Sequence, residues 1–332
     1  MTDKIRWGIL STGWIAKKFA EGLSVLPDAE IVAVGSRAQE TADAFGDEYG
    51  VPHRHASYEA LVGDQDVDVI YIGTPHPFHK DNAILSLEAG KAVLLEKPFT
   101  INAGEAEKVI ALAREKGLFL MEAMWSRYIP IIVKLRELLA EGAIGEVRML
   151  TADLGFRSEF DPKSRLFNLE LGGGALLDVG IYPISFASMV LGTPARIASM
   201  AHLGQTGVDE QAGIVFGYDG GQLAILHTAL QTSTAIEATV MGTKGKIRVH
   251  SPWYYGTTLT LSIEERDDKV ISDEVISLPY EGNGYNFEAA EVNERLREGK
   301  LESDVMPLDE TLAIMQTLDT IRAQWGFKYP ME

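Results

Sequence analysis

The sequence contains no cysteine among its 332 residues. Without cysteine there are no disulfide bonds, no thiol catalysis, no iron–sulfur clusters and no cysteine-ligated zinc, so the alcohol dehydrogenases that use such zinc are excluded. Any acid–base chemistry must therefore come from other side chains.

Positive charge is scarce as well. The 30 lysines and arginines stand against 48 aspartates and glutamates, which gives a formal net charge of −18. This balance repels phosphate backbones and anionic membrane surfaces, so we expect neither nucleic acid nor a membrane as a partner. Residues 1–7 lack the pattern of a signal peptide, and no apolar run approaches the ~20 residues that span a bilayer. We therefore expect a cytoplasmic protein.

What is present is an alternation of strands and helices. A hydrophobic share of 46% with 23% charged residues is typical of a globular enzyme, and the length predicts two domains or one large one. Strands are predicted at 4–10, 30–35, 67–72, 92–95 and 118–121, and helices through Ile15, Phe19, Leu23 and Leu26 and at 38–50, 77–89 and 102–116. This order predicts an α/β Rossmann domain with a doubly wound parallel sheet over residues 1–124.

The pattern changes near residue 125. A helix at 128–141 precedes segments of alternating polarity at 146–154, 222–230, 237–241, 245–250, 257–263 and 270–278, and helices at 286–298 and 308–325 close the chain. Glycine turns between several of these segments favour hairpins. We predict an α+β domain over 125–332 with a large, mostly antiparallel, open-faced sheet.

An imperfect dinucleotide-binding loop follows the first predicted strand. Such a loop reads G-x-G-x-x-G/A, and here it reads Ser11-Thr12-Gly13-Trp14-Ile15-Ala16, with serine in place of the first glycine. Gly13 would let the backbone approach a pyrophosphate, and Ala16 would let the helix pack close to the sheet. A plain tight turn is the alternative, but the position between a strand and a helix favours cofactor binding.

The second predicted strand ends in Ser36-Arg37. NAD-preferring domains carry a carboxylate there for the ribose hydroxyls, whereas a hydroxyl and a guanidinium would hold a 2′-phosphate. An ordinary surface arginine is the alternative. The pair favours NADP.

Glu96-Lys97-Pro98 stands where the predicted strand 92–95 ends, at the edge where open α/β sheets bind ligands. Lys97 would face the cofactor there, or it would be a solvent-exposed lysine that starts a turn. Thr74, His76 and His79 follow the preceding strand, where cofactor contacts are also expected.

Histidine pairs invite a metal interpretation, both in His76 and His79 and in His53 and His55. We reject a metal site because no third histidine or acidic ligand accompanies them at a familiar spacing.

Asp178 and Tyr182 lie four residues apart in the glycine-rich segment 172–183 and would share a helix face. A carboxylate and a phenol would then point together. From spacing alone, a buried tyrosine that bonds a helical aspartate is the favoured explanation of the pair.

These motifs, taken in order, resemble the Gfo/Idh/MocA oxidoreductase family. The resemblance rests on the serine-containing loop, Ser36-Arg37, Thr74–His79, Glu96–Pro98 and Gly172–Tyr182, and it covers nearly the whole chain. Many members of this family carry histidine at the position of Tyr182. In having tyrosine there, the chain resembles the subset that includes dimeric dihydrodiol dehydrogenases and NADP-dependent D-xylose dehydrogenases.

The resemblance implies an NADP-dependent oxidation of a carbinol carbon in a sugar or a trans-dihydrodiol. It makes Lys97 the lysine beside the nicotinamide, Tyr182 the acid/base, and Asp178 the residue that holds the substrate or the lysine. An ammonium near the phenol would favour phenolate, so Lys97 would prepare Tyr182 for proton transfer. A catalytically silent NADP-binding sensor or assembly protein, and a sugar reductase working in the opposite direction, stay open as alternatives.

The resemblance also indicates an aromatic-lined substrate pocket and a homodimer built through the second domain's sheet. The pocket residues it points to are Trp125, Arg127, Phe156, Trp253 and Tyr280. Each of them is equally compatible with core or interface packing.

Overall fold

The computed structural model describes residues 4–265 and 270–332, which form two compact units. The first unit holds residues 1–125 and 281–312, and the second holds 126–280 and 313–332. The first division lies one residue from the predicted domain boundary, but segment 281–312 belongs to the first unit and not to the second. The reason is close packing of α8 (Tyr285–Arg297) on α1 (Trp14–Leu23), where a Cβ on Gly22 would lie 3.0 Å from the Cβ of Tyr285.

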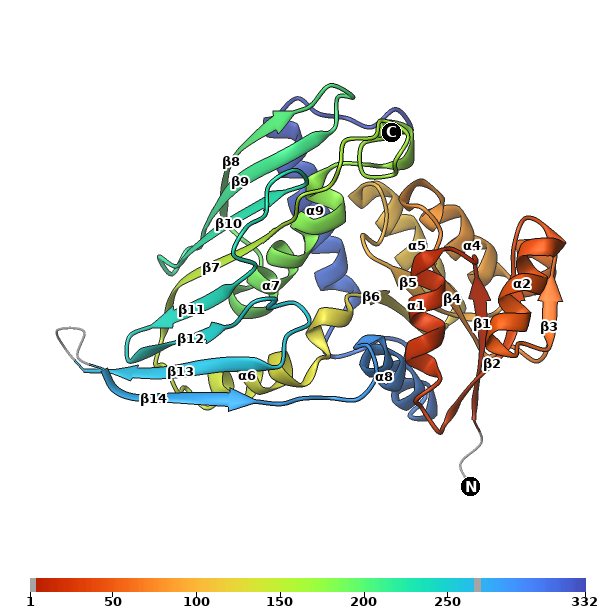
Figure 1. The fold of residues 1–332 in the computed structure, drawn as a ribbon, viewed down its shortest axis with the longest axis horizontal. Helices are drawn as coiled ribbons and strands as arrows, with labels where there is room; N and C mark the ends of the chain where they lie inside the picture. The colour runs from red at the N-terminus through yellow and green to blue at the C-terminus, as the bar shows by residue number, and fades with distance from the viewer. Residues whose placement is uncertain (1–3, 266–269) are drawn as a thin grey trace. The chain divides into compact units, whose positions relative to one another are not determined.

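The first unit is built on a parallel sheet with strand order β3-β2-β1-β4-β5-β6 (Figure 1). Its strands are β1 (Ile5–Leu10), β2 (Ala29–Gly35), β3 (His53–His55), β4 (Val69–Ile72), β5 (Ala92–Glu96) and β6 (Leu120–Ala123). The connecting helices are α1, α2 (Gln39–Tyr49), α3 (Tyr58–Val62), α4 (His79–Glu88) and α5 (Ala103–Lys116). The strand order reverses between β1 and β4, which confirms the predicted doubly wound sheet and marks the crevice where such sheets bind ligands.

The core of this unit comes from strands that are buried on both faces. Every residue of β4 and β5 is buried, as parallel strands covered by helices require. Phe19 of α1 stacks on Tyr71 of β4 with ring centroids 3.8 Å apart, and Trp7 of β1 lies 5.3 Å from Phe19. These contacts fix α1 over the sheet and thereby fix the loop that precedes it.

The second unit is built on a mixed sheet with strand order β14-β13-β12-β11-β7-β10-β9-β8. Its strands are β7 (Val147–Gly155), β8 (Arg196–Leu203), β9 (Asp209–Gly217), β10 (Leu223–Ala229), β11 (Ala238–Gly242), β12 (Gly245–Val249), β13 (Thr258–Glu264) and β14 (Val270–Ser277). Neighbours pair antiparallel except β7 and β10, which run parallel. The mostly antiparallel sheet was therefore predicted correctly, while β8 and β9 were missed.

Helices lie along one face of this sheet, as Figure 1 shows for α6 (Pro130–Ala140), α7 (Ile181–Leu191) and most of α9 (Leu308–Gln324). Large apolar side chains are exposed on its strands, among them Met200, Val215 and Ile225. The open face of the predicted sheet is thus partly apolar.

One stretch of the described chain, Leu169–Leu191, is long and apolar enough to cross a membrane by length and composition, with a mean hydropathy of 1.6. However, 78% of that stretch is buried inside the protein, as in the core helix of a globular domain.

Candidate active site

The loop between β1 and α1 adopts the backbone path of a glycine loop although serine stands in it. Ser11 has a φ of 110°, a conformation that side chains rarely adopt and that costs ~1–3 kcal/mol. Its Oγ accepts a hydrogen bond from the backbone N–H of Gly13 at 3.2 Å. The hydroxyl thus stabilises the turn that the missing glycine would otherwise form.

The N-terminus of α1 is suited to an anion. Gly13 caps the helix without a side-chain hydrogen bond, and no acidic residue lies in the first turn. The first backbone N–H groups and the positive end of the helix dipole therefore have no competing carboxylate. Thr12 and Ile15 are half-buried beside them, and Trp14 is 68% exposed. This donor set fits the pyrophosphate of a dinucleotide.

Ser36 and Arg37 follow β2 at the same edge of the sheet. The Ser36 backbone N–H donates to the His55 carbonyl oxygen at 3.0 Å, and the Ser36 hydroxyl bonds that of Thr41 at 2.6 Å. The Arg37 side chain is exposed and lies near Tyr58. Burial raises the pKa of Tyr58, and the positive charge of Arg37 opposes this rise. Tyr58 gave no signal in the sequence, yet the charge of Arg37 acts on its phenol.

The Glu96-Lys97-Pro98 turn leaves the end of β5 through a cis Lys97–Pro98 peptide bond. Lys97 is half-buried, and its backbone N–H donates to Glu96 Oε2 at 3.1 Å. The turn therefore places a lysine at the carboxyl edge of the sheet, where the sequence predicted it.

His79 is fully buried and joins two turns of this edge. Its Nδ1 lies 2.8 Å from the Pro98 carbonyl oxygen and its Nε2 lies 2.7 Å from that of Thr74. Burial lowers the pKa of His79, and a neutral imidazole carries one N–H, so it donates to one of these two acceptors. His79 thus holds the Lys97 turn in position, and its role as a cofactor contact stays a prediction. His76 packs edge-on against it, with ring centroids 5.7 Å apart.

A buried polar cluster supports the other side of the same turn. Tyr71 donates its hydroxyl to Glu96 Oε1 at 2.6 Å. Glu288 of α8 is completely buried, and neither of its carboxylate oxygens has a hydrogen-bond partner in the described residues. Burial, with the nearby charge of Glu96, raises the pKa of Glu288 well above its ordinary value. Burial therefore disfavours the charged form of Glu288, and nothing in the sequence indicated this cluster.

In the second unit, Asp178 and Tyr182 lie across a change of helix type. Leu176–Gly180 is a π-helix, and α7 begins at Ile181, so the regular α-helical spacing expected from the sequence is replaced by a wider turn. Single π turns inside helices are common at functional sites. Both residues are nearly buried, with exposures of 4% and 6%.

Each of these two residues has a neighbour that the sequence did not single out. Arg165 Nη1 lies 2.6 Å from Asp178 Oδ1, so the carboxylate is held by a guanidinium. The ring of Tyr254 lies 5.2 Å from that of Tyr182, and burial raises the pKa of Tyr254 to about 12. The consecutive aromatic residues 253–255 were the available signal for Tyr254; nothing nearby marked Arg165.

Asp209 of β9 holds the beginning of this helical segment. Its Oδ2 accepts the Leu176 backbone N–H at 2.6 Å. Gly174 has a φ of 121°, and a Cβ there would lie 2.2 Å from Asp209 Oδ1, so only glycine fits. The glycine-rich segment thus lets a buried carboxylate approach the backbone, which places Asp178 and Tyr182.

Burial raises the pKa of Asp209 to about 7. Because its folded pKa lies above the unfolded value near 4, protonation favours the folded state, and this contribution is lost as pH rises from about 4 to about 7. Asparagine cannot ionise. Between these pH limits, we therefore expect the free energy of unfolding of Asp209→Asn to rise relative to that of the wild type by on the order of 4 kcal/mol. Urea unfolding of both proteins at pH 4 and pH 8 measures this. An equal stability difference at both pH values would contradict it.

Three of the five predicted pocket residues are packing residues in the structure. Trp253 is 1% exposed and donates Nε1–H to the Asp153 carbonyl oxygen at 2.7 Å, so it belongs to the core and not to a pocket wall. Arg127 is 2% exposed and donates to the Ser185 hydroxyl and carbonyl oxygen, at 3.0 and 2.9 Å, which braces α7.

The third packing residue is Trp125, and the last two predicted pocket residues, Phe156 and Tyr280, differ from it. Trp125 is 5% exposed and stacks on Tyr285 with ring centroids 4.4 Å apart. Phe156 and Tyr280 are partly exposed, and the Tyr280 hydroxyl donates to the Tyr255 carbonyl oxygen at 2.8 Å. Phe156 and Tyr280 therefore stay candidates for substrate contact.

Comparison with known proteins gives two family matches. Residues 5–124 match an oxidoreductase family with an NAD-binding Rossmann fold, and residues 132–248 match the GFO/IDH/MocA C-terminal domain. A relative from Mus musculus, named trans-1,2-dihydrobenzene-1,2-diol dehydrogenase, is 38% identical over 340 residues that cover 99% of each chain.

Solved structures extend these matches to the whole fold. KijD10, a 3-ketoreductase from Actinomadura kijaniata in complex with NADP and TDP-benzene, is 26% identical, with a TM-score of 0.85 and coverage of 97% of this chain and 98% of its own. An aldose-aldose oxidoreductase from Caulobacter crescentus shares the fold at 24% identity, with a TM-score of 0.87 and 98% coverage of both chains. The protein therefore belongs to the Gfo/Idh/MocA oxidoreductase family and is an NAD(P)-binding enzyme.

Proposed function

We propose that the protein is an NADP-dependent oxidoreductase that transfers hydride between the nicotinamide and a carbinol carbon of a sugar, such as D-xylose, or of a trans-dihydrodiol. The observation that carries the proposal is that two turns, each held by hydrogen bonds from buried residues, carry Lys97 and Tyr182. One holds Lys97 at the carboxyl end of β5, and the other holds Tyr182 behind the π turn. The lysine ammonium and the tyrosine hydroxyl are groups that can transfer a proton during carbinol oxidation. The relatives of the chain are named dehydrogenases, which fits this reaction.

The cofactor would be held by groups from two strand ends. The N-terminus of α1, with Ser11 to Ile15, would bind the pyrophosphate, and Ser36 with Arg37 would bind the 2′-phosphate of NADP. The NADP in the KijD10 structure supports this choice by similarity. Thr74, His76 and the Glu96-Lys97 turn would line the nicotinamide end.

The bound nicotinamide supplies the hydride chemistry, and the protein supplies proton transfer and orientation. The Tyr182 hydroxyl would take the proton of the substrate hydroxyl during oxidation and return it during reduction. Lys97 would favour the charged phenol oxygen by its ammonium. Asp178, fixed by Arg165, would orient the substrate hydroxyl or the lysine.

The cofactor assignment predicts a preference for NADP over NAD in steady-state assays. Arg37→Asp should lower kcat/KM for NADP by about 10- to 100-fold, because a charge-assisted contact with the 2′-phosphate contributes ~1.5–3 kcal/mol. Arg148→Asp, which changes an exposed arginine of the second unit, is the matched control and should leave the preference unchanged. A wild-type preference for NADH over NADPH would overturn the assignment.

Substrate and direction are resolved by one panel of aldoses, polyols and trans-dihydrodiols, monitored by NADPH absorbance in both directions. Oxidation of a sugar or diol supports the proposal, and reduction of a sugar ketone alone supports the alternative of a reductase. Tight NADP binding without turnover of any compound would favour a catalytically silent binding protein.

We also propose that the protein forms a homodimer through the sheet of the second unit. Ile225 of β10 lies opposite Val215 of β9, and both are exposed, as is Met200 of β8 at 80%. Burial of such a row is the usual reason for an apolar sheet face. Light scattering that gave the mass of one chain would contradict it. Location in the cytoplasm stays a prediction.

A further inference from the structure

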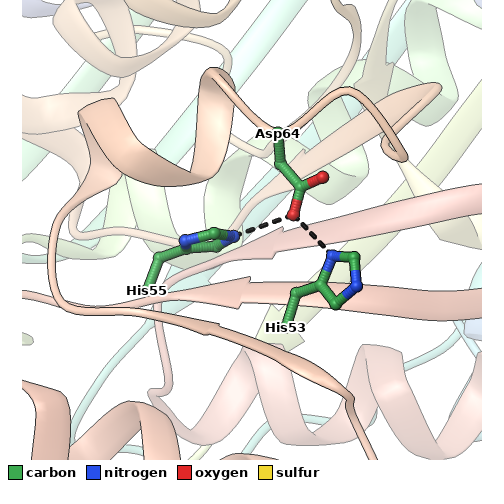
Figure 2. Close-up of side chains that lie close together, drawn as sticks. All are labelled: His53, His55 and Asp64. Carbon is green, nitrogen blue, oxygen red and sulfur yellow. Dashed lines mark hydrogen bonds and ion pairs between the residues drawn. The ribbon is translucent and has the colours of Figure 1, made fainter.

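Two histidines and one aspartate converge at the outer edge of the first unit's sheet (Figure 2). His53 and His55 are the first and third residues of the edge strand β3, so both imidazoles project from the same face. His53 Nδ1 lies 2.8 Å and His55 Nε2 lies 2.9 Å from the same atom, Oδ2 of Asp64.

The chemistry of this set is that of a transition-metal site. Imidazole nitrogen and carboxylate oxygen are ligands that Zn²⁺ binds at ~2.0–2.2 Å, and three protein ligands with one open position is a common arrangement. The three ligand atoms already lie within 4.8 Å of one another. Tetrahedral ligands stand about 3.3 Å apart at these bond lengths, so the carboxylate oxygen, at 2.8 and 2.9 Å from the two nitrogens, needs to move away from each by only a few tenths of an ångström.

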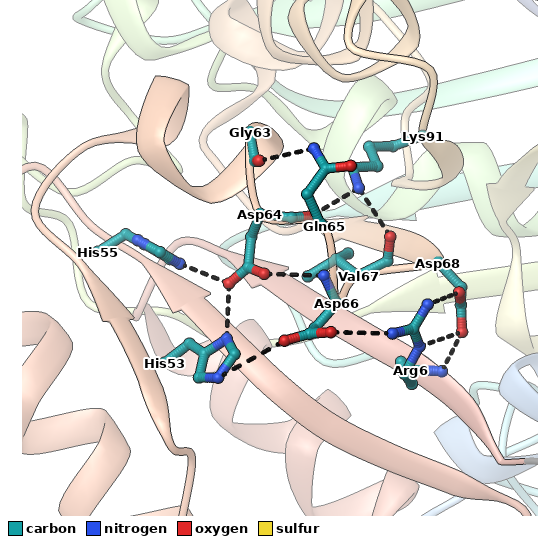
Figure 3. Close-up of polar contacts among 10 residues, drawn as sticks. All are labelled: Arg6, His53, His55, Gly63, Asp64, Gln65, Asp66, Val67, Asp68 and Lys91. Atoms are coloured by element: carbon teal, nitrogen blue, oxygen red, sulfur yellow. Dashed lines mark hydrogen bonds and ion pairs between the residues drawn. The ribbon is translucent and has the colours of Figure 1, made fainter.

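Hydrogen bonds to the Asp64 side chain and to the backbone around it hold this aspartate in place (Figure 3). Asp64 Oδ1 accepts the Asp66 backbone N–H at 2.9 Å, and Lys91 Nζ donates to the carbonyl oxygens of Asp64 and Val67 at 2.6 and 2.8 Å. The carboxylate is therefore fixed before any ligand arrives.

A further carboxylate stands next to the cluster. Asp66 Oδ2 lies 4.0 Å from His53 Nε2, while Asp66 Oδ1 and the Asp68 carboxylate are bound by Arg6. With neutral histidines, three carboxylates face the two cations Arg6 and Lys91, which leaves a net negative charge. The side chains of His53 and His55 are 39% and 24% exposed, so an ion can reach them from solvent.

We propose that His53, His55 and Asp64 bind one divalent transition-metal ion of the zinc class, with water or Asp66 in the remaining position. The sequence did not predict it because the third ligand follows His55 by nine residues and is brought back by α3 and the turn after it. The site does not rest on the proposed function, because none of its three ligands takes part in that mechanism.

The site has a structural connection to the strand end beside it. The His55 carbonyl oxygen accepts the backbone N–H of Ser36, the residue before Arg37. A metal that fixes His55 would therefore fix the position of this segment as well.

Isothermal titration of the tag-free, chelator-treated protein with ZnCl₂ tests the proposal, and the visible spectrum of Co²⁺ reports tetrahedral coordination. We expect one ion per chain. His55→Gln and Asp64→Asn each remove a metal ligand and should weaken zinc binding by at least ~10- to 100-fold, the loss seen when a residue that hydrogen-bonds a ligand is removed. His202→Gln, an exposed histidine on β8, is the matched control and should bind as the wild type does.

Circular dichroism of the metal-free variants ensures that lost binding is not lost folding. Zinc binding that persists in Tyr182→Phe separates the site from catalysis. Absence of saturable binding to the wild type, or equal affinity in His55→Gln and His202→Gln, would overturn the proposal and leave the cluster as a hydrogen-bonded brace of β3.

Discussion

Replacement of Tyr182 by phenylalanine is expected to lower kcat by about 10²- to 10⁴-fold, the range that a positioned acid or base contributes. The substitution removes one oxygen atom from a side chain that is 6% exposed, so the ring can keep its packing against Tyr254. Because the hydroxyl acts on the reacting proton and not on the cofactor, the dissociation constant for NADP should stay the same. Steady-state kinetics with the best substrate of the panel, together with fluorescence titration of NADPH, measure both quantities.

Tyr254→Phe provides the matched control for this experiment. Tyr254 carries the same phenol beside Tyr182, but burial raises its pKa to about 12, so it is a weaker candidate for proton transfer near neutrality. We expect its removal to change kcat far less than the removal of the Tyr182 hydroxyl. Near-normal turnover in Tyr182→Phe, or an equal loss in both variants, would refute the role given to Tyr182.

The parallel sheet was predictable because its central strands have a simple physical signature. β4 and β5 are continuous apolar runs, since helices cover both of their faces. β3 gave no such signal, because three polar residues at the edge of a sheet resemble a loop. β8 was missed for a related reason: its exposed apolar residues, such as Met200, break the expected alternation of polar and apolar faces.

The assignment of α8 to a unit shows a different limit. A helical pattern indicates that α8 has an apolar face, but it does not say which element covers that face. The answer lies in the close approach of α1 at Gly22 and in the hydrogen bond from Asn283 Nδ2 to the Lys18 carbonyl oxygen, 2.7 Å long. Both contacts join segments more than 200 residues apart in the sequence, as the separation of 265 between Asn283 and Lys18 shows.

Some residues of the candidate site could be predicted from the sequence, and others could not. Ser11, Arg37 and Lys97 could be found because each follows a predicted strand, and strand ends are where α/β sheets bind ligands. Asp209 could not be found, because it lies 33 residues from the backbone N–H that it binds. Sequence position therefore identifies candidate ligand-binding groups at strand ends, whereas the residues that hold them in place come from tertiary contacts.

Lys97→Met is the second change with a large expected effect, again a decrease in kcat of about 10²- to 10⁴-fold if the lysine is part of the proton-transfer pair. Methionine has a similar length and removes only the ammonium. Without this charge the phenol oxygen is harder to ionise, so the rise of oxidation rate with pH should move to higher pH. The pH profile of kcat from pH 6 to pH 10, measured beside the wild type, shows both effects.

Lys97→Arg and Lys80→Met separate the role of the charge from that of the turn. Lys97→Arg keeps a cation and should restore part of the wild-type pH profile, although a planar guanidinium does not reproduce the geometry of an ammonium. Lys80 on α4 pairs with Glu105 and Asp81, so its loss removes a lysine without touching the turn after β5. One result would contradict this role: Lys97→Met lowers kcat without shifting the pH profile, and Lys97→Arg does not restore kcat. Lys97 would then be a residue that shapes the turn, and Tyr182 would need another source of positive charge.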